Sequence, residues 1–178
     1  MGTKAHSIIG MDVATVVQML NRAYADEWLA FMQYWTAAKL VKGITRNELQ
    51  KELKQHAAEE FEHADRLATR ILQLGGEILK SPEEILSSAN CGFIKTNDPC
   101  TYHVVEQTIA SERCAIAVYK KIMDETHGKD QITYHLAMQI LQEELDHEEE
   151  FQNFKEDLDL LMEKSKNFCG HKQSGSVK

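Results

Sequence analysis

The two prolines of this chain constrain its fold more than any other feature. Pro82 and Pro99 are the only prolines among 178 residues, and both lie between residues 77 and 100. Proline inside a helix removes a hydrogen bond and clashes with the preceding turn, so the sequence on either side of this stretch is free to form long helices. Residues 77–100 therefore form a long connection, in which residues 82–86 could make a short helix with proline near its first position.

Apolar residues at helical spacing divide the rest of the chain into four segments. The predicted helices cover about residues 12–41, 46–74, 102–126 and 130–163. Gly43, Gly75 and Gly128 lie just after the ends of the first, second and third of them. Two short links and one long connection predict an all-α, up-down four-helix bundle, and we expect the first and third helices to lie parallel.

The length and composition fit one domain. With 43% apolar residues the chain can fill one core, so we expect a single domain over 1–178, with the bundle over about 11–165 and a polar tail over 166–178. A net charge of −8 argues against a free-standing nucleic-acid-binding protein and suits the attraction of cations. No run of 18 apolar residues and no apolar leader occur, so we expect a cytoplasmic protein without a membrane segment.

Two short motifs each occur twice. The pattern E-x-x-A-x-x-x-Y begins at Glu27 and again at Glu112, and E-x-x-H begins at Glu60 and again at Glu144. Glu27 precedes Glu60 by 33 residues, and Glu112 precedes Glu144 by 32. The two halves of the chain therefore repeat one helical hairpin with an offset of 84 to 85 residues. Residues three apart share a face of a helix, so each glutamate of an E-x-x-H motif lies beside its histidine.

The repeated positions predict a metal site. The motif glutamates share the helical register of core residues such as Ala30 and Tyr34, so they point inward. An unpaired buried carboxylate costs several kcal/mol, whereas two divalent cations balance four of them. Oxygen and imidazole ligands suit iron or manganese. The candidate ligands are Glu27, Glu60, His63, Glu112, Glu144 and His147.

Ordinary solvated faces are the competing interpretation of these acids. A lone E-x-x-H would carry little weight, but two such pairs at matching distances from a second repeated motif favour metal. Other acids lie off the inward face and are expected to face solvent or a cavity, namely Glu59, Glu62, Glu143, Glu149 and Glu150. His56, one turn before Glu60, is a weaker candidate for supporting the ligands.

At these residues the sequence resembles the ferritin superfamily, and within it the bacterioferritin type of di-iron site inside one subunit, over about residues 11–160. The resemblance implies two iron ions, with manganese as an alternative, bridged by Glu60 and Glu144. By the same resemblance, Glu27 and His63 would complete the ligands of one ion, and Glu112 and His147 those of the other. Tyr34 would lie beside the centre.

Two departures from bacterioferritins refine this resemblance. Their haem is held by a methionine directly after the glutamate of the second helix, where this chain has Phe61, so we expect no haem. The chain also ends in a polar segment without an apolar fifth helix. The lack of a fifth helix and the cysteines near the third helix resemble the Dps-like ferritins called thioferritins. This resemblance implies a homo-oligomer, namely a dodecamer.

The cysteines also suggest a local disulfide. Cys100 and Cys114 would lie about 20 Å apart along a helix, too far for a bond. Cys114 is two residues after Glu112 and points away from the metal, toward the outer face where the long connection must pass, so Cys91 is its better partner. An unpaired buried thiol and a pairing of Cys91 with Cys100 remain the alternatives.

Three functions are compatible with these residues. The first is a ferroxidase that oxidises ferrous iron with hydrogen peroxide or oxygen and stores the product in a cage. The second is a non-storing enzyme with two metals, either a rubrerythrin-like peroxidase, which the lack of a CxxC module opposes, or a manganese catalase. The third is a DNA-protecting protein of the Dps kind, which the charge of −8 opposes. Its only support is the basic tail with Lys164, Lys166, Lys172 and Lys178.

Overall fold

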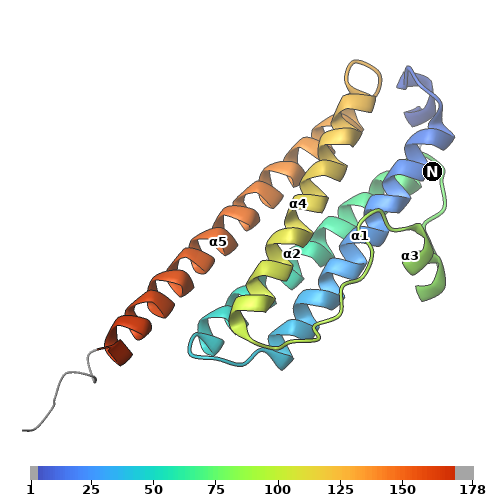
Figure 1. Cartoon of the computed structure of the whole chain (residues 1–178). Coiled ribbons are helices and arrows are strands. Elements are labelled where there is room, and N and C mark those ends of the chain that lie inside the picture. The colour runs from blue at the N-terminus through green and yellow to red at the C-terminus, as the bar shows by residue number, and fades with distance from the viewer. Residues whose placement is uncertain (1–3, 171–178) are drawn as a thin grey trace, which may run out of the picture.

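The computed structural model of the protein describes residues 4–170, and side chains as far as residue 164. After a short 3₁₀ helix, its elements are α1 (Val13–Leu40), α2 (Arg46–Gln73), α3 (Pro82–Ser88), α4 (Thr101–Thr126) and α5 (Gln131–Gly170). The predicted all-α bundle with a long connection is thus confirmed, including the short helix after Pro82 (Figure 1). Helix α5 continues past the predicted end at Glu163, and residues 171–178 of the predicted tail lie outside the described residues.

Local interactions determine where the helices begin and end. The side chain of Asp12 accepts a hydrogen bond from the Thr15 amide at 2.9 Å and begins α1. Ser81 accepts one from the Glu84 amide and begins α3, with proline in the first turn, where its missing N–H costs nothing. Gly128, with a φ of 71°, takes the left-handed conformation that separates α4 from α5.

The long connection sets the direction of the third long helix, and the expectation that α1 and α4 lie parallel is wrong. Where α1 ends, the amide of Lys42 donates to the carbonyl of Pro99 at 2.7 Å, just before α4 begins. Where α1 begins, the amide of Gly10 donates to the carbonyl of Lys129, just after α4 ends. The two helices are therefore antiparallel. The connection runs along the bundle from the end of α2 and brings the chain back to the end where α1 finishes (Figure 1).

Two apolar clusters fill the bundle on either side of a buried polar layer. Packing is closest within the hairpins α1–α2 and α4–α5, as Figure 1 shows. One cluster includes Val16, Leu20, Leu67, Ile71 and Ile140, and the other includes Ala37, Leu49, Leu53, Val105 and Phe151. The polar layer between them holds the motif residues, so the fold supports the site from both sides. Among the described residues no helix is long and apolar enough to cross a membrane.

A buried ion pair connects the two hairpins at one end of the bundle. Arg70 on α2 places one guanidinium nitrogen 2.9 Å from both carboxylate oxygens of Asp130, and another nitrogen donates to the hydroxyl of Thr133 at 3.0 Å. Asp130 also accepts a hydrogen bond from the amide of Thr133, which begins α5. One arginine thus supports the carboxylate that caps a neighbouring helix.

Candidate metal centre

All six predicted ligands converge in the polar layer, and every one is buried. Each of α1 and α4 contributes one glutamate, and each of α2 and α5 contributes a glutamate and a histidine. Ligand atoms within 4.8 Å of one another form two groups of four: Glu27, Glu60, His63 and Glu144, and Glu60, Glu112, Glu144 and His147. The groups share Glu60 and Glu144. Two adjacent cation positions with two common carboxylates fit this arrangement.

The inner carboxylates have too few partners within the protein, which is what a bound cation would require. Among the described residues, one oxygen of Glu60, both oxygens of Glu144 and Nδ1 of His147 are buried without a hydrogen-bond partner. Nδ1 of His63 lies 3.0 Å from Glu144 Oε1, but this contact lacks hydrogen-bond geometry. A buried carboxylate oxygen without a partner is costly, and a divalent cation compensates it. The residues present therefore fit a pair of metal ions.

The titrating groups show how strongly these charges interact. Burial raises the pKa of Glu27, and the charge of Glu60 raises it further. Burial and then the charge of Glu144 raise the pKa of Glu112 in the same way. Burial alone would lower the pKa of His147, but Glu144 and Glu60 outweigh it and raise that pKa to about 11. The negative charge of the inner carboxylates thus favours protonation of the neighbouring groups, and it equally favours the binding of metal cations.

Two tyrosines support the glutamates of α1 and α4 reciprocally. The hydroxyl of Tyr34 on α1 donates to Glu112 on α4 at 2.8 Å, and the hydroxyl of Tyr119 on α4 donates to Glu27 on α1. Burial and the nearby glutamates raise the pKa of both tyrosines, so both remain donors. The sequence singled out Tyr34 alone as a site residue. Tyr119 could have been found from the repeat, because it is the last residue of the second E-x-x-A-x-x-x-Y motif.

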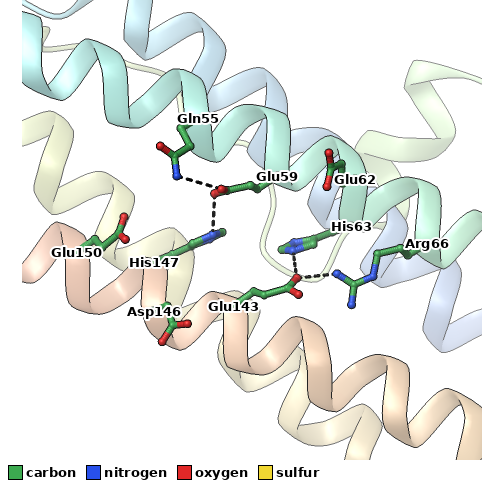
Figure 2. A pocket seen from close by; sticks show the side chains of 9 residues that line it. All are labelled: Gln55, Glu59, Glu62, His63, Arg66, Glu143, Asp146, His147 and Glu150. Carbon is green, nitrogen blue, oxygen red and sulfur yellow. Dashed lines mark hydrogen bonds and ion pairs between the residues drawn. The ribbon is translucent and has the colours of Figure 1, made fainter.

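Two further glutamates hold the outer nitrogens of the histidines (Figure 2). Nε2 of His63 lies 2.7 Å from Glu143 on α5, and Nε2 of His147 lies 3.1 Å from Glu59 on α2. Arg66 donates to Glu143 at 2.6 Å. Glu59 and Glu143 do border a cavity, as expected, but they also bind the histidines, which the sequence did not indicate. A carboxylate on the outer nitrogen fixes the ring and leaves Nδ1 to the inner site.

The site is open on one side and nearly closed on the other. Between α2 and α5 a cleft of about 360 Å³ leads to the two histidines, and its lining residues are those labelled in Figure 2. On the opposite side Cys91 and Gly92 of the long connection cover Glu27 and Glu112, and only about 10 Å³ of space remains there. That space holds at most about one water molecule. Ions therefore have room to approach through the α2–α5 cleft.

A disulfide fastens the covering segment. Cys91 and Cys114 are bonded, with a Cα–Cα distance of 5.9 Å, and Cys100 is a free, exposed cysteine. The predicted pairing is confirmed, and both alternatives are wrong. Asp26 on α1 holds the same segment by accepting hydrogen bonds from the amide of Cys91 at 2.7 Å and from Asn90 at 2.6 Å.

The other residues considered in the sequence lie around the cleft and on the surface. His56 is buried, with its ring 4.2 Å from that of His147 and its Nε2 3.0 Å from Glu150. Glu62 lines the cleft, and Glu149 is exposed. Phe61 packs against Trp28 on the outer side of the α1–α2 hairpin.

The comparison with known families decides the identity of the fold. The family description "Ferritin-like domain" matches residues 17–161, which contain all six candidate ligands. The chain belongs to the ferritin-like family. The resemblance seen at the motifs is confirmed by this match.

Individual relatives agree with this assignment. A protein of Pyrococcus furiosus named "DNA protection during starvation protein" is 31% identical over 144 residues, which are 80% of this chain and 78% of that protein. A bacterioferritin of Desulfovibrio desulfuricans is 28% identical over 79% of this chain and 74% of its own length. A solved structure of a bacterioferritin-related protein from Bacteroides fragilis, described as a dodecameric thioferritin, is 34% identical. It superimposes with a TM-score of 0.89 over 92% of this chain and 98% of that one.

Proposed function

We propose that the protein is a ferroxidase that oxidises ferrous iron at the paired site and stores the ferric product in an oligomeric cage. The observation that carries this proposal is the pair of four-residue ligand groups that share Glu60 and Glu144. Two ions held side by side can deliver two electrons to one oxidant. Family membership supports iron as the metal, with manganese as the alternative.

The reaction needs an oxidant that accepts two electrons. Each of two ferrous ions loses one electron, and the two electrons with two protons convert one hydrogen peroxide molecule into two water molecules. Oxygen is the alternative oxidant. The chain's own part is to hold the substrate ions between Glu27, Glu112 and the shared carboxylates. Tyr34 fixes Glu112, Tyr119 fixes Glu27, and the long connection keeps the site closed on the side of Cys91.

Storage and assembly are supported by the relatives. The Bacteroides fragilis protein, similar over almost the whole chain, is described as dodecameric. We therefore propose a homo-dodecamer in which oxidised iron leaves the paired site and accumulates as mineral. We expect no haem, because Phe61 cannot ligate iron, and an absorption spectrum with a stoichiometric haem band would contradict this. We also expect no tight DNA binding at a charge of −8 per subunit, which a gel-shift assay checks.

The variants Glu60→Ala and Glu144→Ala test the proposed reaction. Removing a shared carboxylate leaves both cation positions incomplete, so rapid ferrous oxidation should disappear in each variant while the far-UV circular dichroism stays helical. Stopped-flow absorbance with peroxide and with oxygen measures this, and Glu149→Ala removes an exposed acid of α5 as the matched control. Wild-type rates in both Glu60→Ala and Glu144→Ala would remove the proposed site.

The competing non-storing enzyme predicts a different product. A peroxidase or catalase would turn over peroxide without accumulating iron in the protein. Ferrous iron added aerobically in large excess should leave far more ferric ions with the protein than the two per subunit that the paired site can hold. Iron that stops near two ions per subunit would favour the non-storing enzyme.

A further inference from the structure

A third group of ligand-type side chains includes Glu150, which lines the α2–α5 cleft. Glu52 and His56 on α2 and Glu150 on α5 bring one ligand atom each within 4.8 Å of one another. Nε2 of His56 lies 3.0 Å from Glu150. His56 is fully buried, whereas the side chains of Glu52 and Glu150 are 32% and 55% exposed. The group therefore has a buried nitrogen at its base and two carboxylates that face solvent.

The hydrogen bonding of His56 is incomplete within the described protein. Its Nδ1 is buried without a hydrogen-bond partner, and the acidic oxygen near it, on Glu59, is 4.0 Å away. If the neutral ring carries its proton on Nδ1, the lone pair of Nε2 faces the carboxylate of Glu150, which is repulsive. If the proton is on Nε2, Nδ1 is a buried acceptor with no donor. A cation between Nε2 and the two carboxylates removes the repulsion and leaves the Nδ1 proton directed toward Glu59.

This group has the same types of side chain as the inner site, namely a histidine between glutamates. His63 and His147 each place one nitrogen among carboxylates and the other on an outer glutamate. His56 has the reverse orientation, with Nε2 3.0 Å from Glu150 and Nδ1 4.0 Å from Glu59, beyond hydrogen-bond distance. His56 also belongs to a group with Glu112 and His147, so it lies next to one of the two inner positions.

The two ends of the cleft differ in charge. Under the 84-residue offset between α2 and α5, Glu150 corresponds to Arg66, and His56 corresponds to Ile140. Arg66 forms an ion pair with Glu143 at one end, and Glu150 lies toward the other end in Figure 2. Arg66 and Glu143 balance each other at one end, whereas Glu52 and Glu150, with Lys51 3.6 Å from Glu52, leave a net negative charge at the other. The end with His56 is therefore the favoured approach for a cation.

We propose that Glu52, His56 and Glu150 form a third divalent-cation site, distinct from the two inner positions, which binds a cation arriving from solvent and passes it to the position at His147. One imidazole and two carboxylates suit Fe²⁺, Mn²⁺, Co²⁺ or Zn²⁺. The binding part of this proposal stands on the three residues alone. The transfer part rests on the proposed ferroxidase function.

Cobalt binding to the full-length assembled protein tests the site. Wild-type protein should bind three Co²⁺ per subunit by isothermal titration calorimetry and by native mass spectrometry, and Glu52→Gln/Glu150→Gln should bind one fewer. The matched control is Glu62→Gln/Asp146→Asn, which removes two other acids of the same cleft and should bind as many as the wild type. An equal count in wild type and Glu52→Gln/Glu150→Gln, or an equal loss in the control, overturns the site.

A variant of the inner site separates this proposal from the proposed function. Glu60→Ala/Glu144→Ala should keep one Co²⁺ per subunit, and adding Glu52→Gln/Glu150→Gln to it should remove that ion. Retention of the ion in the fourfold variant contradicts the third site. A wild-type protein that binds three ions but oxidises no iron would contradict the ferroxidase and leave this site standing.

Ferrous oxidation kinetics test the transfer step. Glu52→Gln/Glu150→Gln should raise the KM for ferrous iron about tenfold, with a smaller change in kcat. The reason is that the variant no longer concentrates cations near the cleft. Glu62→Gln/Asp146→Asn should change the KM less. An unchanged KM in Glu52→Gln/Glu150→Gln overturns the transfer part.

Discussion

Each inner histidine has carboxylates near both ring nitrogens, so its orientation depends on residues outside the candidate ligands. His63 lies between the inner carboxylates and Glu143, and His147 lies between them and Glu59. The carboxylate on Nε2 selects the tautomer in which Nδ1 is free to bind a cation. Arg66 fixes Glu143 in turn, so the orientation of one ligand is determined by a chain of three side chains.

The variants Glu143→Gln and Glu59→Gln test this role. Each should weaken Co²⁺ binding at the inner positions about ten- to a hundredfold, since the amide is a poorer acceptor for the imidazole N–H. Competition with a coloured chelator measures the affinity. Glu149→Gln is the control, because Glu149 is exposed on the same helix. Equal affinity in all three variants and the wild type would show that the outer glutamates do not position the ligands.

At the residue scale, the sequence identified the candidate ligands that converge in the structure, but it did not identify the residues that support them. The spacing of E-x-x-H places Glu60 beside His63 on one helix, and this is visible in the sequence. The contact of His63 with Glu143 joins residues 80 positions apart on two helices. This contact depends on how α2 and α5 pack, which cannot be predicted from residue spacing within either helix.

At the scale of elements, the pair Arg70–Asp130 connects α2 to the start of α5. Arg70→Met keeps an apolar stem but leaves the buried carboxylate of Asp130 without its cation. The free energy of unfolding should fall by about 3 to 5 kcal/mol, measured by urea denaturation at one protein concentration. Arg113→Met is the control, because Arg113 is exposed in its ion pair with Glu148 and such pairs contribute about 0 to 1 kcal/mol. Similar losses in the two variants would contradict a special role for Arg70.

The same pair predicts a dependence of stability on pH. Burial would raise the pKa of Asp130, but the hydrogen bonds from Thr133 and Arg70 outweigh it and lower the pKa below its ordinary 3.8. A lowered folded-state pKa means that this stabilisation is fully present above pH 3.8 and is lost as the pH falls through the folded value. The wild type should therefore lose more stability than Asp130→Asn between about pH 4 and pH 2. Parallel curves for the two proteins would contradict this assignment.

The disulfide is the second connection between elements that can be tested. It links Cys91 of the long connection to Cys114 on α4 across 23 residues. Cys91→Ser/Cys114→Ser should lower the free energy of unfolding by about 2 to 4 kcal/mol, because the unfolded chain gains freedom. Cys100→Ser should change it little, since Cys100 is exposed and free. If dithiothreitol destabilises the wild type no more than the double variant, the bond does not stabilise the fold.

The sequence predicted which residues form helices better than it predicted how the helices run. Proline positions and apolar spacing gave the helix ends to within a few residues, except at the end of α5. The direction of α4 depends on whether residues 77–100 turn back at once or follow the bundle to its other end. The pairing of Lys42 with Pro99 decides this, and it is a contact between distant segments that the spacing does not encode.

At the scale of the whole molecule, a single chain leaves large apolar side chains uncovered. Trp35, Met32 and Phe61 on the α1–α2 hairpin and Leu86 on α3 are each about half exposed. Apolar surface of this kind is typical of contacts between proteins. The number of subunits follows from the geometry of those contacts and cannot be predicted from one chain's pattern. The dodecamer was inferred from resemblance alone.

Native mass spectrometry checks the assembly. We expect a complex of twelve times the 20.3 kDa of one chain. Trp35→Glu should break it into smaller species, because a charge would be buried against apolar neighbours, whereas Glu149→Gln should not. A wild-type monomer or dimer would contradict the cage and favour the non-storing enzyme.

The reciprocal pairing of the two halves suggests how the chain arose. A hairpin that supplies one glutamate, one tyrosine and one E-x-x-H motif completes the site only when a second hairpin faces it, so an ancestral half-length protein would have worked as a homodimer. In such a dimer every mutation occurs twice. Duplication and fusion of the gene would end that constraint, because each half could then vary alone. The cleft shows the result, with Arg66 at one end and its repeat counterpart Glu150 at the other.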